Sequence, residues 1–315
     1  MTSFKSHKNM SRTLLSICIP TYNRAAYLPE CLDSIVSQLN TELLKNEVEV
    51  VLADNASTDT TTEIVQSYQR RYPNLAIVYF RNEKNLGFDR SFAKLIEKST
   101  GIYCLSLGDD DALFENAIPT VLAKIKDSKD IPFFGLNCWG YDASLKNKVL
   151  PHPNLRIPHD EKYMSLSKYI HSIEKYTNLV GIFVGLSTQL FKRDPWVEFP
   201  DKEKFFDTLA IHTYVNLSIF KDAPFIMIAE PIVKTRSSNI RWDVFAGLET
   251  IQGRIQSTLE IVMWVRDTFN LPISNSRLRA YFYTREYWFT LKEIIKRKLV
   301  QAKLGNVIIY YRKLR

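Results

Sequence analysis

Three adjacent carboxylates are the strongest chemical signal in this chain. Asp109, Asp110 and Asp111 follow Gly108, directly after an apolar run at residues 103–107. Neighbouring carboxylates repel one another unless a cation or backbone donors offset their charge, and carboxylate oxygens are ligands that divalent cations prefer. The triplet therefore indicates a metal-dependent site for an anionic substrate. The alternative is a solvated turn that caps the next helix, and the surrounding elements must decide between the two.

The elements around the triplet alternate regularly over the first 140 residues. Short apolar runs predict buried strands at residues 14–19, 48–53, 76–80, 103–107 and 133–136. Longer amphipathic patterns predict helices at residues 25–38, 60–71, 88–98 and 114–126. Strands that alternate with helices of this length are typical of an α/β protein with a doubly wound, mostly parallel sheet, in which ligands bind at the carboxyl ends of the strands.

Polar residues cluster where the predicted strands end. Residues 21–24 follow the first strand, residues 54–59 follow the second, and the acidic triplet follows the fourth. Because parallel strands end at a common edge, we expect these clusters to meet there. This convergence favours the binding site over the solvated turn.

Four sequence blocks carry a resemblance to a known family. They are residues 19–24 (IPTYNR), 54–59 (DNASTD), 85–87 (NLG) and 108–111 (GDDD). Their order and spacing resemble family 2 glycosyltransferases of the GT-A fold, and among them the bacterial enzymes that build O-antigen and other surface polysaccharides. Abequosyltransferase-like members share a similar segment at residues 85–90. The resemblance implies a Rossmann-like GT-A fold with a C-terminal helical extension.

The same resemblance implies an enzyme: an inverting glycosyltransferase that moves a hexosyl or deoxyhexosyl group from a nucleotide sugar to a lipid-linked or other oligosaccharide acceptor. The implied pathway is O-antigen, lipopolysaccharide or capsule biosynthesis. The residues implied at the nucleotide sugar are Pro20, Thr21, Tyr22, Asn23, Arg24, Asp54, Asn85, Gly87, Asp89, Arg90, Asp109, Asp110, Arg236 and Asn239. For Asn23 a helix cap, and for Asp89 with Arg90 a local surface ion pair, are the alternative interpretations.

The resemblance also implies a divalent metal, Mn²⁺ or Mg²⁺, between which the sequence does not choose. Asp110 is the preferred ligand, with Asp111 and His212 as further candidates. Gly108 stands where the usual pattern of the family has its first Asp, so the division of roles between Asp109 and Asp111 is open. A helical histidine such as His212 is more often structural.

An inverting transferase needs a general base for the acceptor hydroxyl. Asp207 is the first candidate because it lies 97 positions after Asp110 and precedes an expected helix that starts at Thr208. Glu203 is the second candidate. Phe206 stands where similar enzymes have Glu, and a helix cap is the alternative role for Asp207.

Three regions are expected: residues 1–140 as the nucleotide-sugar half, 141–244 as the acceptor half of the same domain, and 245–315 as a basic helical region. The net charge is +8, and residues 271–315 hold eleven Lys or Arg against two Glu, so the remainder is close to neutral. A basic, aromatic helix favours an anionic membrane surface, whereas packing on the protein or on a second subunit, as in a homo-oligomer, is the alternative.

Neither a signal peptide nor a membrane-spanning segment is expected, because no apolar run is long enough. The four cysteines show no CxxC spacing, which favours reduced thiols. These features predict a cytoplasmic protein, peripheral to the inner face of the cytoplasmic membrane, with no nucleic-acid partner. Two competing functions remain: nucleotidyl transfer, disfavoured because no Gly-rich phosphate loop is present, and a catalytically silent glycan-binding or assembly protein on the same fold.

Overall fold

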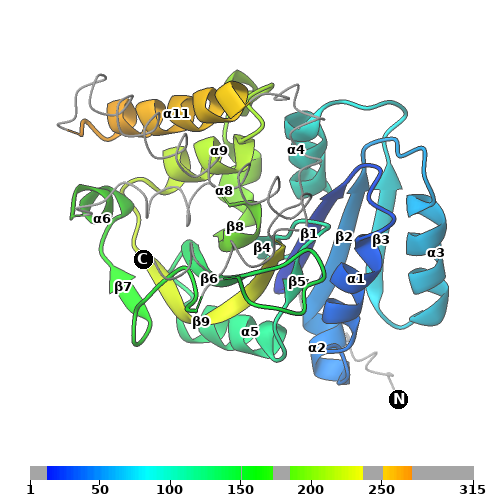
Figure 1. Ribbon diagram of the computed structural model, residues 1–315. Coiled ribbons are helices and arrows are strands. Elements are labelled where there is room, and N and C mark those ends of the chain that lie inside the picture. The colour runs from blue at the N-terminus through cyan, green and yellow to red at the C-terminus, as the bar shows by residue number, and fades with distance from the viewer. Residues whose placement is uncertain (1–12, 150, 173–184, 237–250, 272–315) are drawn as a thin grey trace, which may run out of the picture. The chain divides into compact units, whose positions relative to one another are not determined.

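A computed structural model describes residues 13–149, 151–172, 185–236 and 251–271. The chain divides into two compact units, residues 1–239 and 240–315. The described part of the first unit forms a nine-stranded sheet in the order β3-β2-β1-β4-β8-β6-β9-β5, with β7 paired to β9 (Figure 1). Its strands are β1 (Leu15–Thr21), β2 (Val48–Asp54), β3 (Ala76–Arg81), β4 (Tyr103–Ser106), β5 (Ala112–Leu113), β6 (Phe133–Tyr141), β7 (Glu161–Tyr163), β8 (Gln189–Lys192) and β9 (Phe225–Arg236).

The sheet is mixed but mostly parallel in direction. Strands β1 to β4 are mutually parallel, and β8 pairs antiparallel with both β4 and β6. Strand β6 therefore runs in the direction of β4, and β9 is parallel to β6. Six carboxyl ends meet at one edge of the sheet, and the antiparallel β8 starts at that same edge. The five strands predicted from the sequence are all confirmed.

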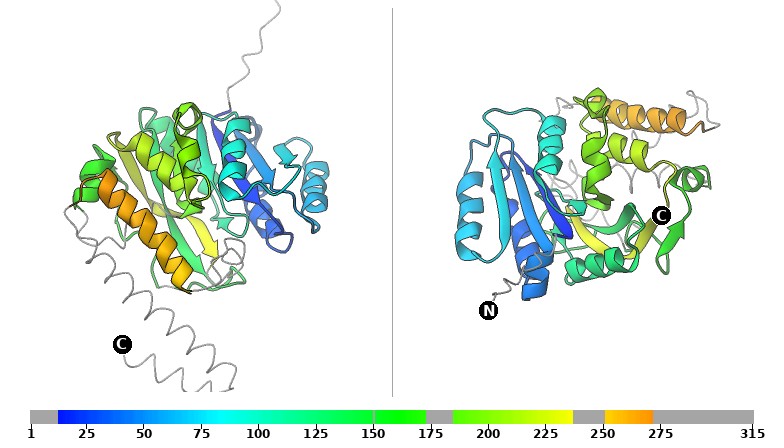
Figure 2. Two further views of the ribbon diagram at one scale, coloured as in Figure 1. Left: turned by 90° about the horizontal axis from the view of Figure 1, so that it is seen from above. Right: turned by 180° about the vertical axis from the view of Figure 1, so that it is seen from behind.

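Helices cover both faces of the sheet (Figures 1 and 2). On one face, α1 (Leu28–Val36), α3 (Thr61–Arg71) and α5 (Ala117–Asp127) share a buried apolar cluster with Leu15, Ile17 and Ile19 of β1. On the other, α4 (Phe88–Lys98), α8 (Arg193–Glu198) and α9 (Ile211–Phe220) contact one another, and Phe92 packs edge-on to Trp196. Alternate residues of β1 thus serve opposite faces, as the pleat of a strand requires.

Most of the short elements were not predicted from the sequence. They are α2 (Glu42–Glu47), β5, β7, the 3₁₀ turns η1 (Leu186–Thr188) and η2 (Lys202–Phe205), and α8. Helix α6 (Leu166–Ser172) lies in a stretch whose sequence pattern does indicate a helix, around residues 166–176. One expected boundary was wrong, because helix α9 begins at Ile211 and not at Thr208. Strand β9 also continues into a polar run that begins at Lys234 and whose composition indicates a loop.

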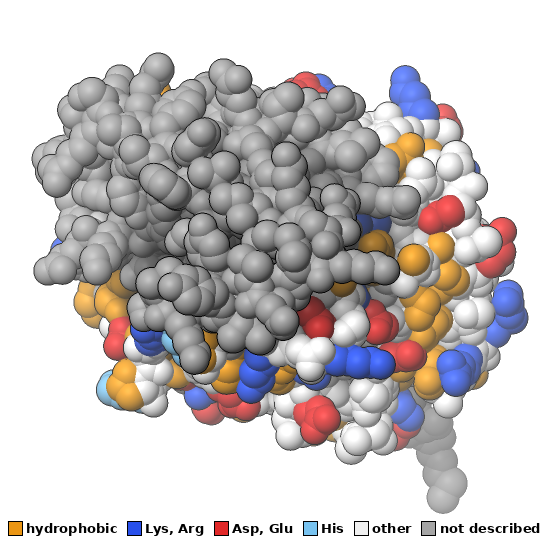
Figure 3. Space-filling view, viewed as in Figure 1, with side chains coloured by type: hydrophobic (Ala, Val, Ile, Leu, Met, Phe, Trp, Pro, Cys, Tyr) orange, Lys and Arg blue, Asp and Glu red, His pale blue; other side chains and the backbone are white. Residues whose placement is uncertain are grey.

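The second unit is described only through α11 (Ile251–Thr268) and the three residues after it. The predicted basic and aromatic region from residue 272 onward lies outside the described residues. Within the described ranges, no helix combines the length and the apolar character that crossing a bilayer requires. On the face drawn in Figure 3, described acidic and basic side chains are interspersed.

Candidate functional site

The turn after β1 places a buried arginine beside the acidic triplet. Pro20 and Thr21 end β1, Tyr22 follows, and Arg24 is only 8% exposed. The Arg24 guanidinium lies 3.7 Å from an oxygen of Asp109 and 3.8 Å from one of Asp110. These separations exceed hydrogen-bonding distance, so Arg24 compensates the charge of the triplet without being fixed to it.

The triplet itself is held by a residue from the second half of the chain. The Ser187 hydroxyl accepts a hydrogen bond from the Gly108 N–H at 2.8 Å and donates one to Asp111. The other oxygen of Asp111 accepts from the backbone N–H of Arg236 at 2.9 Å. Both oxygens of Asp111 are therefore engaged by the protein. The side chain of Asp110 is 20% exposed, and its role as the preferred ligand stays a prediction.

Burial dominates the electrostatics of the triplet. It raises the pKa of Asp109 to about 8 and the pKa of Asp111 to about 7, and the neighbouring charge of Asp110 acts in the same direction. Arg24 partly offsets the shift at Asp109, and the hydrogen bond from Ser187 partly offsets the shift at Asp111. Burial therefore favours the protonated forms of these two carboxyl groups, and a bound cation would favour their ionised forms.

Arg236 forms hydrogen bonds with three segments of the chain around the triplet. Its Nε donates to the carbonyl of Asp110 at 2.8 Å, and its terminal nitrogens bond to Glu30 of α1 and to the carbonyl of Ala143. The guanidinium also lies 5.0 Å from the ring centre of Tyr27. Arg236 is thus a buried part of the triplet's support. Asn239, the other residue predicted in this segment, lies outside the described residues.

Asp54 is fully buried and is engaged by its own neighbours. It accepts hydrogen bonds from the Ser57 N–H at 2.8 Å and the Tyr79 hydroxyl at 2.7 Å, and Arg81 lies 3.7 Å away. In this state no part of the carboxylate faces solvent. The structure places Asp54 at the expected edge, in a role that shapes the turn after β2.

Asn23 joins the first two polar blocks. Its backbone N–H donates to Ser57 at 2.9 Å, and its side-chain oxygen accepts from the Thr58 N–H at 2.7 Å. The cap interpretation for Asn23 is wrong, because α1 starts later, after Tyr27. The β1–β2 register brings the two polar blocks together, because Thr21 of β1 lies opposite Asp54 of β2.

Asn85 and Gly87 belong to a hydrogen-bonded loop before α4. The Asn55 side chain donates to Asn85 Oδ1 at 2.8 Å and to the Gly87 carbonyl at 3.2 Å, and its oxygen accepts from the Leu86 N–H at 2.9 Å. Gly87 has φ of 79°, a conformation that favours glycine. Asn55 was not among the predicted site residues, although it lies in the second block.

Asp89 and Arg90 do not form the local surface pair that was one interpretation. Asp89 is 2% exposed and accepts from the backbone N–H groups of Leu209 at 2.8 Å and Ile211 at 3.1 Å. Arg90 forms a bidentate ion pair with Asp207, at 2.5 and 3.0 Å. Both residues therefore face the loop that carries the candidate base.

Asp207 is exposed and does not cap α9, so its alternative role as a helix cap was wrong. Its backbone is left-handed, with φ of 68°, and the helix starts four residues later. The Arg90 hydrogen bonds lower the pKa of Asp207. Glu203 is exposed in η2, close enough to act electrostatically on Arg90. Which of the two acts as the base stays a prediction.

His212 is 4% exposed, with its ring edge-on to Phe88 and Phe92. These surroundings are those of a packed histidine. Across the described residues, no group of three or more His, Cys, Asp or Glu side chains is arranged to hold a metal ion. The triplet nevertheless fits the way in which Mg²⁺ is commonly held, by one or two carboxylates together with substrate phosphates.

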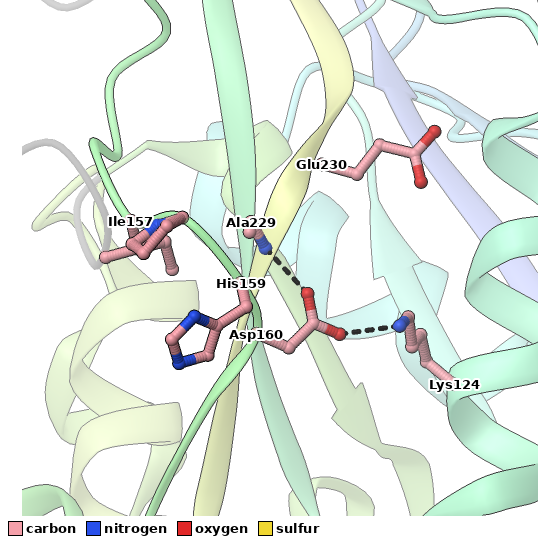
Figure 4. A pocket seen from close by; sticks show the side chains of 7 residues that line it. Lys124, Ile157, His159, Asp160, Ala229 and Glu230 are labelled. Carbon is pink, nitrogen blue, oxygen red and sulfur yellow. Dashed lines mark hydrogen bonds and ion pairs between the residues drawn. The ribbon is translucent and has the colours of Figure 1, made fainter.

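A separate hollow of about 640 Å³ lies at a register shift of β9 against β6 (Figure 4). Asp160 accepts from the Ala229 N–H at 2.9 Å and pairs with Lys124 of α5 at 2.7 Å. Glu230, also in its lining, precedes Arg236 by six residues in β9, which is roughly 20 Å of strand. The hollow is therefore distinct from the triplet.

The chain is similar to proteins of one known family. The model of "Glycosyl transferase family 2" matches residues 16–183. The abequosyltransferase RfbV of Salmonella typhimurium is 32% identical over 232 residues, which is 72% of this chain and 67% of that protein.

Solved structures give the same fold. TarS of S. aureus in complex with UDP matches with a TM-score of 0.57 at 16% identity, over 87% of this chain and 72% of that chain. The mannosyltransferase PcManGT of Pyrobaculum calidifontis, in complex with GDP-Man and Mn²⁺, matches with a TM-score of 0.55 at 15% identity, over 88% and 72%. At such identities the likeness concerns the fold alone, which is of the GT-A type.

Proposed function

The chain belongs to glycosyl transferase family 2, and we propose that it transfers a sugar, with inversion, from a nucleotide-diphosphate sugar to a saccharide acceptor. The observation that carries this proposal is the meeting of the β1 turn, the acidic triplet and the end of β9 at one edge of the sheet. Arg24, Asp110 and Arg236 join these three segments.

Arg24 supports the binding of a diphosphate. Its Nη1 is buried and has no hydrogen-bond partner among the described residues. The neighbouring Thr21 hydroxyl acts on Asp109 and partly offsets the burial that raises the pKa of that carboxyl. Buried donors without partners are unfavourable unless a ligand satisfies them. A phosphate oxygen could accept from Arg24 Nη1, and the arginine would stabilise the negative charge that develops on the departing diphosphate.

The triplet supports a divalent cation at the same place. Asp110, with Asp109 as second carboxylate, would hold Mn²⁺ or Mg²⁺, because Asp111 is engaged by Ser187 and Arg236. When bound, the ion would neutralise charge on the diphosphate leaving group. Ser187 and Arg236 hold the loop through their hydrogen bonds to Gly108 and Asp111.

The proton of the acceptor hydroxyl needs a base on the face opposite the leaving group. Asp207 is the first candidate because it is exposed and ionised, and its carboxylate is oriented by Arg90. Glu203 is the alternative.

The acceptor class is proposed by analogy with the relatives. We assign the enzyme to bacterial O-antigen, lipopolysaccharide or capsule assembly on a lipid-linked acceptor at the inner face of the cytoplasmic membrane. The basic region after residue 271 would contact that surface, and a homo-oligomer is the other use of the same region.

The test is release of nucleoside diphosphate from a panel of nucleotide sugars, with Mn²⁺, with Mg²⁺ and with EDTA. One donor should be turned over in a metal-dependent way, and Asp110→Ala should abolish turnover. Asp222→Ala, which removes an exposed carboxylate beyond α9, is the control that should keep it. Tight glycan binding without release of nucleotide from any donor would instead favour the non-enzymatic glycan-binding protein.

A further inference from the structure

The first turn of α4 contacts a loop that lies about 120 residues further along the chain. We propose that Asp89 and Arg90 are positioning residues, which hold residues 207–211 and orient Asp207 toward the acceptor. This inference rests on the proposed function, since it concerns the candidate base of the transfer reaction. It replaces the donor-binding role that the sequence predicted for both residues.

Asp89 cannot serve the loop and a nucleotide at once. Its side chain is buried, one carboxylate oxygen accepts from the Leu209 N–H and the other accepts from the Ile211 N–H. The Ile211 N–H belongs to the first turn of α9, where N–H groups have no partner within the helix. Asp89, although distant in sequence, therefore satisfies a backbone N–H group of α9 that a helix cap would otherwise satisfy.

The loop needs such external support because its backbone is strained. Asp207 and Leu209 both have left-handed φ values, 68° and 61°, and neither is glycine. Residues in this region persist only where their surroundings fix them. Within the loop, the Thr208 hydroxyl donates to the Phe205 carbonyl at 2.8 Å. The backbone N–H groups of Leu209 and Ile211 donate to Asp89.

Arg90 fixes the side chain of Asp207 itself. Two parallel hydrogen bonds define the plane of the carboxylate as well as its position. The guanidinium is in turn placed over the ring of Phe206, 4.8 Å from its centre. Phe206, at the position where similar enzymes carry Glu, therefore helps to place the Arg90 guanidinium.

Helix α4 is anchored at its start on the nucleotide-binding half. Asn55 bonds to the Gly87 carbonyl, and Gly87 immediately precedes the helix. The same short stretch of chain therefore connects the turn after β2 with the loop that bears Asp207. The turn after β2 and the loop that bears the candidate base are thus linked through the start of α4.

The test uses Asp89→Asn, Arg90→Gln and Arg90→Lys in the full chain. Two surface variants serve as matched controls: Arg71→Gln removes an exposed arginine over a tyrosine ring, and Asp201→Asn removes an exposed ion-pair partner of Lys204. For each variant, donor affinity, kcat of transfer and amide hydrogen exchange at residues 207–211 are measured. Amide hydrogen exchange measures how well the loop is held, independently of enzymatic activity.

We expect kcat of transfer to fall by about 10- to 100-fold, as for a misplaced reacting group, while the donor Kd stays within about twofold. Exchange at Leu209 and Ile211 should rise in Asp89→Asn. Arg90→Lys should fail to restore kcat, because an ammonium group cannot form both hydrogen bonds in one plane. The two controls should match the wild-type protein in all three measurements.

Two results would overturn the proposal: unchanged exchange at residues 207–211 in Asp89→Asn, or a weakened donor Kd with kcat intact. Failure of the base assignment is distinguishable from these. If Asp207→Asn still transfers sugar while the Asp89 and Arg90 variants lose both kcat and exchange protection, the base is another residue and the loop is still held by α4.

Discussion

Ser187 donates a hydrogen bond to Asp111, a residue 76 positions earlier in the chain. The contact exists because β8 runs antiparallel to β4, so the turn before β8 reaches the edge where β4 ends. The same hydroxyl accepts from the Gly108 N–H. One serine of the second half of the chain thus fixes the loop that carries the acidic triplet.

Ser187→Ala should loosen this loop. The substitution leaves the buried Gly108 N–H and one Asp111 oxygen without a partner, which costs roughly 1–3 kcal/mol of unfolding free energy. We expect a lower midpoint in chemical denaturation and weaker metal-dependent donor binding. Ser67→Ala, on the exposed face of α3, is the matched control. Equal stabilities of the two variants would contradict the role given to Ser187.

Two glycines should respond differently to alanine. A Cβ at Gly108 would lie 3.1 Å from an oxygen of Asp110, 3.2 Å from one of Asp111 and 3.3 Å from the Ser187 hydroxyl. At Gly87 it would meet nothing within 4 Å, but φ of 79° strains any other residue. Gly108→Ala should therefore impair turnover more than stability, because it displaces carboxylates.

Gly87→Ala should instead lower stability by about 1 kcal/mol or more, the cost of a left-handed residue with a side chain. Comparison of denaturation midpoints with kcat for the two variants tests this contrast. A Gly108→Ala protein with wild-type turnover would show that the triplet tolerates displacement.

The pH dependence of stability should report the buried carboxylates. Burial raises the pKa of Asp109 and Asp111 far above the value of about 3.9 for an unfolded Asp. Between these values the folded state binds more protons than the unfolded state, so the free energy of unfolding falls as the pH rises. The window runs from about pH 4 to about pH 8.

Thermal unfolding of EDTA-treated protein from pH 5 to pH 8 measures this slope. Asp109→Asn should flatten the profile, and Mn²⁺ should restore stability at pH 8 because it binds the ionised carboxylates. The lowered pKa of Asp207, set by its hydrogen bonds to Arg90, acts only below about pH 4 and lies outside the window. A wild-type slope in Asp109→Asn would exclude Asp109 as the source.

Local patterns in the sequence predicted the first half of the fold well. The β1 run has apolar Leu15, Ile17 and Ile19 on one face, and such strands with their intervening helices leave few alternatives to a parallel sheet. The meeting of the polar blocks at one edge followed from strand direction alone. Those inferences needed only the spacing of residues close in sequence.

Contacts between distant residues were beyond the sequence. Asp89 looked like a ligand or a surface ion, and only the packing of α4 against α9 made it the cap of another helix. A helix cap was the alternative to the base role for Asp207, but Leu209 turns the chain in a left-handed conformation before the helix begins. The position of Ser187 beside the triplet follows from the antiparallel direction of β8. This strand has only four residues, which are too few to show a clear alternation of apolar and polar residues.

The central claim is a metal-dependent nucleotide-sugar site built on the triplet, and thermal unfolding with a panel of nucleotide sugars tests it most directly. A donor at 100 times its Kd should stabilise the wild-type protein by about 2.7 kcal/mol, a shift of several degrees. We predict this shift for one donor in the presence of Mn²⁺ and its loss in Asp110→Ala. If no nucleotide sugar shifts the midpoint, or if Asp110→Ala responds like the wild type, the account is contradicted.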